Sequence, residues 1–126
     1  MATILIVDDC SAVRTVIERI LGISGFAMEA CHFATDGEDA LEVMGRHRVD
    51  LVISDINMPR LDGEGLLQRM SEDTELSKIP VVIVSSDSTQ SRMERLLAMG
   101  ARAYVVKPFK AQAFREQVER VLGVEK

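Results

Sequence analysis

The chain has 126 residues, 47% of them hydrophobic and 28% charged, which is typical of one compact globular domain with a sizeable core. Its net charge of −5 disfavours nucleic acid and anionic membrane surfaces as direct partners. No apolar stretch approaches the roughly 18 residues that cross a bilayer, and the first residues lack signal-peptide character, so we expect a cytoplasmic protein without membrane insertion.

Strand-length apolar runs recur along the chain. In chain order they are Ile4–Val7, Met28–Phe33, Leu51–Ser54, Val81–Val84 and Ala103–Val106. The second run is weaker and alternates between apolar and polar residues, whereas most of the others carry Val and Ile at consecutive positions. Consecutive β-branched residues are typical of strands that are covered on both faces, as in a parallel sheet.

A segment with helical periodicity follows each apolar run. These segments lie around Val13–Leu21, Ala40–Met44, Glu64–Met70, Met93–Leu97 and Phe114–Leu122, and their apolar residues recur every three or four positions. A strand followed by a helix, five times over, predicts right-handed crossovers and a parallel sheet with helices packed against it. The pattern therefore predicts an α/β fold.

Turn and capping residues predict several helix ends. Gly22, Gly45 and Gly100 follow three of the helical periods, at positions where a left-handed residue commonly ends a helix. Thr35 and Ser91 each stand three residues before a Glu, a spacing typical of capping boxes. We expect these two residues to open the second and fourth helices.

Acidic residues end two of the predicted strands. Asp8 and Asp9 follow the first strand directly, and Asp55 follows the third. The carboxyl ends of parallel strands share one edge of the sheet, so the three carboxylates should converge there. At an effective dielectric constant of about 20 and a separation of roughly 5 Å, each pair repels by about 3 kcal/mol. A cation among them relieves this repulsion, and an oxygen-only ligand set favours a hard ion such as Mg²⁺.

The other strand ends supply complementary chemistry. Ser85 and Ser86 end the fourth strand, and Lys107 ends the fifth. A lysine at the end of a buried strand needs an anion, which the acidic residues provide. Pro108 follows Lys107, which makes a cis peptide bond accessible. Carboxylates, a hydroxyl and an ammonium around a metal suit phosphoryl transfer to a carboxylate, with Asp55 as the nucleophile.

Five segments in this order resemble the receiver domain of two-component response regulators, closest to the stand-alone, CheY-like chemotaxis type. They are ILIVDDCSAVR, FATDGEDAL, DINMPRLDG, IPVVIVSSDS and GARAYVVKPF, and together they reach from about Thr3 to Leu122. The resemblance implies a flavodoxin-like (βα)5 fold with a doubly wound, five-stranded parallel sheet in the order 2-1-3-4-5. We expect residues 1–126 to form a single receiver domain without an output domain.

The resemblance also implies metal-binding and phosphoacceptor roles. Asp55 would accept a phosphoryl group from a sensor histidine kinase, a histidine phosphotransfer protein or a small phosphodonor. Asp9, the Asp55 carboxylate and the main-chain carbonyl of Asn57 would bind Mg²⁺, for which Mn²⁺ can substitute. Asp8 would hold the metal through a water molecule, and Lys107 would contact the phosphoryl group.

The resemblance further implies a conformational switch formed by residues of the fourth and fifth strands. Ser85 occupies the hydroxyl position where the family commonly has Thr, and Tyr104 occupies the aromatic position that turns inward when the hydroxyl moves. A cis peptide bond would join Lys107 and Pro108. The expected output face consists of the fourth helix, the fifth strand and the fifth helix, and it would bind an unidentified downstream protein target.

The sequence leaves two other functions open. The first is a Mg²⁺-dependent phosphohydrolase that passes through an aspartyl phosphate. Enzymes of the haloacid dehalogenase type need an Asp two residues after the nucleophile, where this chain has Asn57. The second is a pseudo-receiver that binds partners without phosphate, which the presence of Asp9, Asp55, Ser85 and Lys107 disfavours. We therefore expect a signalling switch that catalyses only its own phosphorylation and dephosphorylation.

Overall fold

The computed structural model describes residues 2–23 and 28–123; the outermost residues of the expected domain, 1 and 124–126, and the segment 24–27 lie outside them. The strands are β1 (Ala2–Val7), β2 (Met28–Ala34), β3 (Leu51–Ser54), β4 (Val81–Ser85) and β5 (Ala103–Val106). The helices are α1 (Ser11–Gly22), α2 (Gly37–Arg46), α3 (Gly63–Ser71), the short 3₁₀ helix η1 (Leu76–Lys78), α4 (Gln90–Ala98) and α5 (Ala111–Leu122). Every predicted strand and helix is present.

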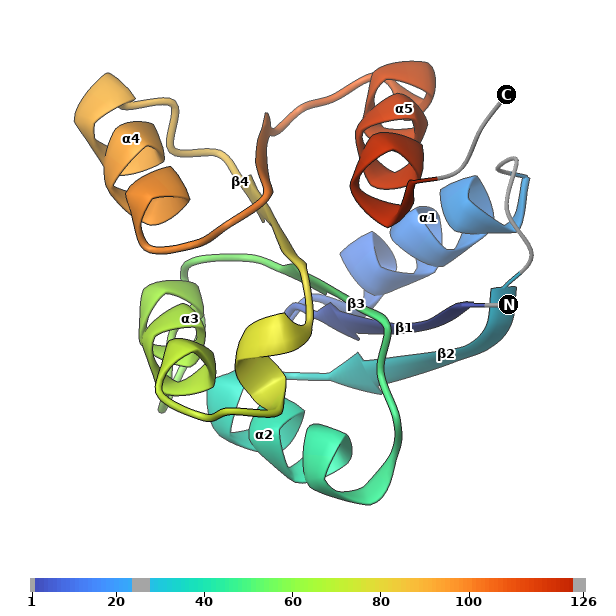
Figure 1. Ribbon diagram of the computed structural model, residues 1–126. Coiled ribbons are helices and arrows are strands. Elements are labelled where there is room, and N and C mark those ends of the chain that lie inside the picture. The colour runs from blue at the N-terminus through green and yellow to red at the C-terminus, as the bar shows by residue number, and fades with distance from the viewer. Residues whose placement is uncertain (1, 24–27, 124–126) are drawn as a thin grey trace.

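The strands form one parallel sheet in the order β2-β1-β3-β4-β5. Helices α1 and α5 cover one face, and α2, α3 and α4 lie against the other (Figure 1). This arrangement confirms the doubly wound, flavodoxin-like α/β fold and the strand order that the resemblance implies.

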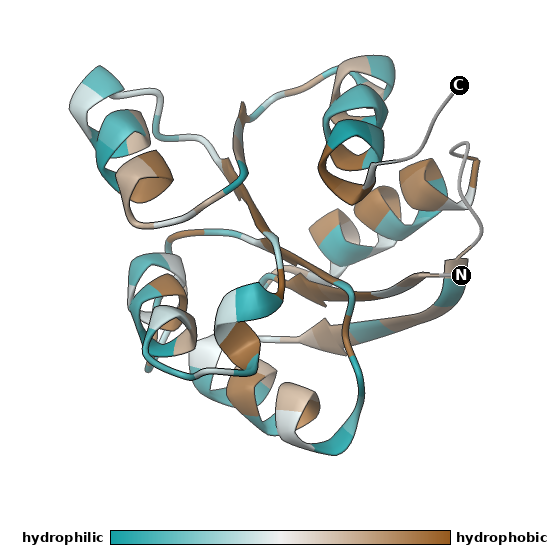
Figure 2. Ribbon diagram, viewed as in Figure 1, coloured by the Kyte–Doolittle hydropathy of each residue, from teal (hydrophilic) through white to brown (hydrophobic). Residues whose placement is uncertain are grey.

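Alternate residues of β1 enter two separate hydrophobic cores. Leu5 and Val7 pack with side chains of α2 and α3, whereas Ile4 and Ile6 pack with side chains of α1 and α5. All four side chains are fully buried. Consecutive positions are apolar because both faces of the sheet are covered, and Figure 2 shows the central strands as mostly hydrophobic.

The strand order reverses at β1, which has β2 on one side and β3 on the other. The register pairs Val7 of β1 with Ser54 of β3, so Asp8 and Asp55 leave the sheet as neighbours. The Asp55 amide donates a hydrogen bond to the Val7 carbonyl at 3.0 Å. Ligands of doubly wound sheets bind at the carboxyl ends of the strands beside such a reversal. The fold therefore brings the predicted acidic residues to the position where a site is expected.

The glycine predictions are confirmed at one helix end of three. Gly100 follows α4 with a φ of 116°, in the region that favours glycine. Gly22 is the last residue of α1 and Gly45 lies inside α2, and neither has a positive φ. Those two predictions are wrong because each glycine belongs to its helix instead of following it. The left-handed cap of α5, Gly123 with a φ of 74°, was not predicted.

Both predicted capping boxes are wrong. Helix α2 is capped by Asp36, one residue beyond Thr35, and the Asp36 carboxylate accepts a hydrogen bond from the Asp39 amide at 2.9 Å. Asp is the stronger N-cap residue of the two candidates. Helix α4 is preceded by Thr89, so Ser91 lies within its first turn. The local pattern placed the two helices correctly but missed their first residues.

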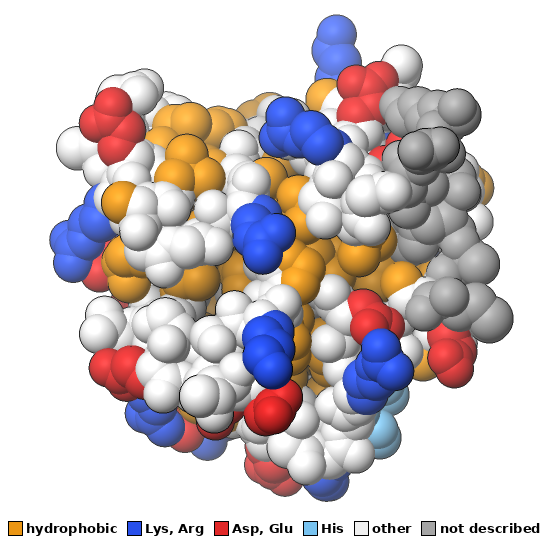
Figure 3. All heavy atoms as spheres, viewed as in Figure 1, with side chains coloured by type: hydrophobic (Ala, Val, Ile, Leu, Met, Phe, Trp, Pro, Cys, Tyr) orange, Lys and Arg blue, Asp and Glu red, His pale blue; other side chains and the backbone are white. Residues whose placement is uncertain are grey.

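The charged side chains are distributed over several elements. On the face shown in Figure 3, Lys and Arg side chains lie apart from one another, with hydrophobic, acidic and other polar side chains between them. Among the described residues, no helix combines the length and the apolar character that a membrane span needs.

Candidate functional site

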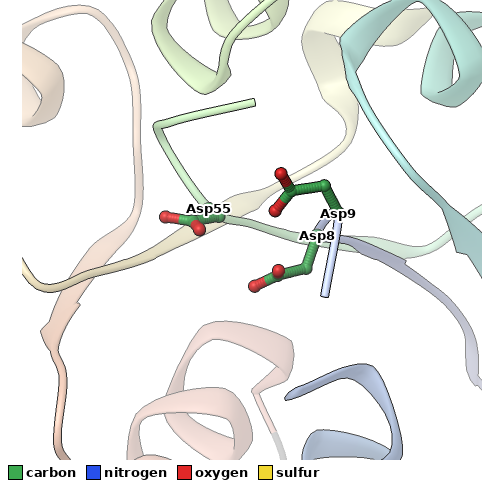
Figure 4. A group of neighbouring side chains, drawn as sticks. All are labelled: Asp8, Asp9 and Asp55. Atoms are coloured by element: carbon green, nitrogen blue, oxygen red, sulfur yellow. The ribbon is translucent and has the colours of Figure 1, made fainter. Parts of the chain in front are cut away.

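Three carboxylates converge at the carboxyl ends of β1 and β3. Asp8 and Asp9 leave β1 and Asp55 leaves β3, and their side chains lie together at one edge of the sheet (Figure 4). One carboxylate oxygen of each residue lies within 4.8 Å of one oxygen of both others. The Asp8 side chain is 4% exposed and that of Asp55 is 14% exposed, whereas Asp9 is exposed. The predicted convergence is confirmed.

Lys107 meets two of these carboxylates from the end of β5. Its Nζ atom lies 3.3 Å from Oδ2 of Asp8 and 3.3 Å from Oδ2 of Asp55. Burial alone would lower the pKa of this ammonium, but the charges of Asp55 and Asp8 together outweigh burial and raise the pKa above 10.5. The ammonium is therefore charged at neutral pH, and the stability it contributes is lost only as the pH rises through that raised value.

Main-chain amides hold the remaining oxygens of the buried Asp8 and the half-buried Asp55. Oδ1 of Asp8 accepts a hydrogen bond from the Cys10 amide at 2.9 Å, and Oδ1 of Asp55 accepts one from the Ile56 amide at 2.7 Å. Asp9 accepts no hydrogen bond from the described residues. With the three carboxylates ionised, Lys107 leaves two formal negative charges. This balance, together with oxygen-only donors, suits one hard divalent cation.

Ser85 and Tyr104 are joined through the loop that follows β4. Ser85 is buried, and its Oγ atom accepts a hydrogen bond from the Asp87 amide at 3.1 Å. The Tyr104 hydroxyl donates to the Asp87 carbonyl at 2.5 Å. Burial raises the pKa of the half-buried Tyr104 phenol. One short loop segment therefore contacts both residues that the resemblance assigns to a switch.

The remaining predicted site residues are Asn57, which follows β3, and Pro108, which follows β5. Asn57 is exposed in the loop between β3 and α3. The peptide bond between Lys107 and Pro108 is cis, as predicted. The site residues thus come from four strands, β1, β3, β4 and β5, and the loops that follow them.

The sequence did not predict the role of Gly63, the first residue of α3. Its amide donates to the Ile56 carbonyl at 2.8 Å and closes the loop after Asp55. A Cβ atom at this position would lie 2.1 Å from the Asp55 carbonyl oxygen. A glycine directly after the N-cap Asp62 was the available signal, but glycine at a helix start has other common explanations.

We expect Gly63→Ala to lower the free energy of unfolding by about 3 kcal/mol, because the new methyl group overlaps main-chain atoms that have to move. Chemical denaturation measures this change. Gly45→Ala is the matched control: a Cβ there meets nothing within 4 Å, so this helical substitution should stabilise the domain by about 0.5–1 kcal/mol. Equal effects of the two substitutions would contradict the close contact.

The doubly wound fold and the acidic cluster at its strand ends place the chain among α/β proteins that bind ligands at a topological switch point. A family model for the response regulator receiver domain matches residues 4–119. The chemotaxis protein CheY of Pseudomonas aeruginosa is 36% identical over 118 residues, which cover 94% of this chain and 94% of that protein. The chain belongs to the response regulator receiver domain family of two-component signalling proteins.

Two solved structures share the fold over nearly the whole chain. One is the receiver domain of a sensor histidine kinase of Pseudomonas aeruginosa PAO1, with a magnesium ion coordinated in its active site cleft; its TM-score is 0.82 at 27% identity, and the match covers 97% of this chain and 98% of that chain. The other is a CheX-CheY-BeF3-Mg complex of Borrelia burgdorferi, with a TM-score of 0.85 at 28% identity, covering 95% and 88% of the two chains.

Proposed function

We propose that this receiver domain is a phosphorylation-activated switch that accepts one phosphoryl group on Asp55 in a Mg²⁺-dependent reaction. The observation that carries the proposal is the convergence of Asp8, Asp9 and Asp55 with Lys107, which contacts two of the three carboxylates at 3.3 Å. Such a cluster combines a nucleophile, ligands for a cation and a group that binds phosphoryl oxygens.

The residues present fit a magnesium ion. Asp9, Asp55 and the main-chain carbonyl of Asn57 would hold the ion directly, and Asp8 would hold it through water. All of these donors are oxygens, which Mg²⁺ and Mn²⁺ prefer. When bound, the ion supplies positive charge that offsets the charge of the phosphoryl oxygens. A magnesium ion in the cleft of one solved relative supports this assignment.

The chain's own residues would carry the transfer as follows. A carboxylate oxygen of Asp55 forms a bond to phosphorus while the bond from phosphorus to the donor's leaving atom breaks, and an aspartyl phosphate results. The leaving atom is an imidazole nitrogen of a phosphohistidine or the acyl oxygen of a small phosphodonor. The Lys107 ammonium is already charged beside Asp55 and is placed to pair with a phosphoryl oxygen.

The conformational response would run through Ser85 and Tyr104. A phosphoryl oxygen that attracts the Ser85 hydroxyl removes the acceptor of the Asp87 amide. Because the Tyr104 hydroxyl is bonded to the carbonyl of the same Asp87, the loop and the tyrosine ring should move together. The face formed by α4, β5 and α5 would then change its partner affinity, and a coupling of roughly 1–3 kcal/mol alters affinity by about 5- to 150-fold.

We further propose a cytoplasmic location and protein partners on both sides of the switch. A sensor histidine kinase or a histidine phosphotransfer protein would donate the phosphoryl group, and a downstream protein target would bind the output face. The net charge of −5 supports protein rather than nucleic acid as the direct partner. The CheX-CheY complex among the solved relatives is a precedent for a protein partner.

Intact-mass measurement with acetyl phosphate tests the proposal. We expect one phosphoryl group to be added in the presence of Mg²⁺ and none after chelation of the metal by EDTA. Absence of an adduct while Mg²⁺ is demonstrably bound leaves rapid dephosphorylation or a phosphate-independent pseudo-receiver, and binding of beryllofluoride decides between these two. Steady release of phosphate from phosphate esters would instead favour the phosphohydrolase that the sequence left open.

Ser85→Ala should separate phosphorylation from switching. The variant keeps the nucleophile and the proposed metal ligands, so it should still take up a phosphoryl group or beryllofluoride. It should lose the conformational response, because the hydroxyl that contacts Asp87 is gone. The chain has one Tyr and no Trp, so its intrinsic fluorescence reports on Tyr104 alone. We expect beryllofluoride to change this fluorescence in the wild type but not in Ser85→Ala, and an equal change in both would contradict the proposed coupling.

A further inference from the structure

A two-bond ion pair joins Arg60 and Asp36 beside the proposed phosphorylation site. Arg60 lies in the loop of residues 55–62, between β3 and α3, and Asp36 directly precedes α2. The Arg60 Nε atom lies 2.8 Å from Oδ2 of Asp36, and the Arg60 Nη2 atom lies 3.1 Å from Oδ1. Asp36 is only 3% exposed. The two hydrogen bonds fix both the orientation of the Arg60 guanidinium group and its distance from the Asp36 carboxylate.

Asp36 is itself anchored to a rigid element. Its Oδ1 atom accepts a hydrogen bond from the Asp39 amide at 2.9 Å and caps α2. The hydrogen bonds from Arg60 lower the pKa of the Asp36 carboxyl in spite of its burial. The carboxylate is therefore ionised at neutral pH and holds the arginine at a fixed position relative to α2.

Two main-chain hydrogen bonds tie the same loop on either side of Arg60. The Gly37 amide donates to the Leu61 carbonyl at 2.8 Å, and the Gly63 amide donates to the Ile56 carbonyl at 2.8 Å. A Cβ atom at Gly37 would lie 2.7 Å from the Leu61 carbonyl oxygen, so the loop and the start of α2 are in close main-chain contact. The Arg60 side chain adds a further connection between the loop and the start of α2, through its ion pair with Asp36.

Arg60 also has a backbone conformation that its residue type disfavours. Its φ is 61°, in the left-handed region where Gly and Asn are much more readily accommodated than a long side chain. If the turn were the only requirement at this position, Gly or Asn would therefore be more favourable there than Arg. The ion pair with Asp36 gives a reason for an arginine at this position, because only the long side chain reaches the buried carboxylate.

The loop held in this way carries the main-chain carbonyl of Asn57. We propose that Arg60 and Asp36 are positioning residues for the metal and phosphoryl site: their ion pair fixes the loop so that the Asn57 carbonyl is preorganised as a ligand. This inference rests on the proposed function. Neither residue touches the phosphoryl group, and both act through the loop between them and Asp55.

Mg²⁺ affinity, measured by calorimetric titration, tests the inference in two variants that break the pair differently. Arg60→Gly relieves the left-handed backbone, which offsets the loss of the ion pair, so the free energy of unfolding should stay nearly unchanged. Asp36→Asn keeps a good N-cap for α2. We expect each variant to bind Mg²⁺ about tenfold more weakly, the low end of what outer ligands to a metal site contribute. Saturating Mg²⁺ should restore the rate of phosphorylation by acetyl phosphate.

The sign of the Arg60→Gly effect excludes a simple charge effect, because removal of a nearby positive charge alone would strengthen Mg²⁺ binding. Arg46→Gln is the matched control, since it breaks the exposed pair between Arg46 and Glu42 and should leave the affinity unchanged. If both pair variants bind Mg²⁺ as tightly as the wild type, this inference is overturned but the proposed function is not. The same holds if the Arg46→Gln control loses as much Mg²⁺ affinity as the pair variants. Absence of Mg²⁺ binding by the wild type would overturn the proposed function and this inference with it.

Discussion

Asp55→Asn is expected to abolish phosphoryl incorporation from acetyl phosphate. The amide preserves the shape of the side chain but is not a nucleophile toward phosphorus, and no other carboxylate occupies its place at the end of β3. In metal-free buffer the same substitution should raise the free energy of unfolding by about 1 kcal/mol, because it removes two repulsive carboxylate pairs and one attractive pair with Lys107. Intact mass measures the first effect and chemical denaturation the second.

Asp62→Asn is the matched control for this substitution. Asp62 caps α3 and accepts a hydrogen bond from the Gly65 amide at 2.8 Å, and Asn is an equally good N-cap. It lies in the same loop as the site but outside the acidic cluster, so the control should be phosphorylated as the wild type is. Residual Mg²⁺-dependent phosphorylation of Asp55→Asn would show that another residue is the acceptor.

Lys107→Met is expected to slow phosphorylation by about 10²-fold, the typical cost of removing one preorganised group that stabilises developing negative charge. The same variant should bind Mg²⁺ more tightly than the wild type, because the ammonium no longer competes for oxygens of Asp8 and Asp55. Methionine keeps most of the apolar length of the side chain. The time course of intact mass with acetyl phosphate gives the rate, and calorimetric titration gives the Mg²⁺ affinity.

Opposite effects on rate and affinity distinguish this account of Lys107 from a general loss of structure. An unfolded or loosened domain would lose both properties. Lys110→Met serves as the control, because Lys110 is exposed three residues further along the chain and its substitution should leave both measurements unchanged. A Lys107→Met variant that is phosphorylated at the wild-type rate would contradict the contact with the phosphoryl group.

Much of the fold was predictable because its signals are local. Each strand is a short run of apolar residues, and each helix repeats its apolar positions within a few turns. Asp8 and Asp55 were predicted to be neighbours because parallel strands align their carboxyl ends, and the register of Val7 with Ser54 confirms this. The order of the strands depends on non-local contacts, and only the resemblance to receiver domains predicted it.

Other parts of the site have no local signal. Arg60 and Asp36 are 24 residues apart in the chain, and their pairing depends on how the loop after β3 meets the start of α2. The acceptor of the Tyr104 hydroxyl is a main-chain carbonyl, which carries no side-chain signature. The failed cap at Thr35 has a different cause: two adjacent residues could cap α2, and Asp36, the stronger N-cap residue, is the one that does.

Chemical mapping of the phosphorylated residue tests the central claim most directly. The protein is incubated with acetyl phosphate and Mg²⁺, the acyl phosphate is reduced with borohydride, and the modified residue is located by peptide mass spectrometry. We expect conversion of Asp55 alone, dependent on Mg²⁺ and prevented by EDTA. Modification at Asp8, Asp9 or a residue outside the cluster, or modification that persists after the metal is removed, would contradict it.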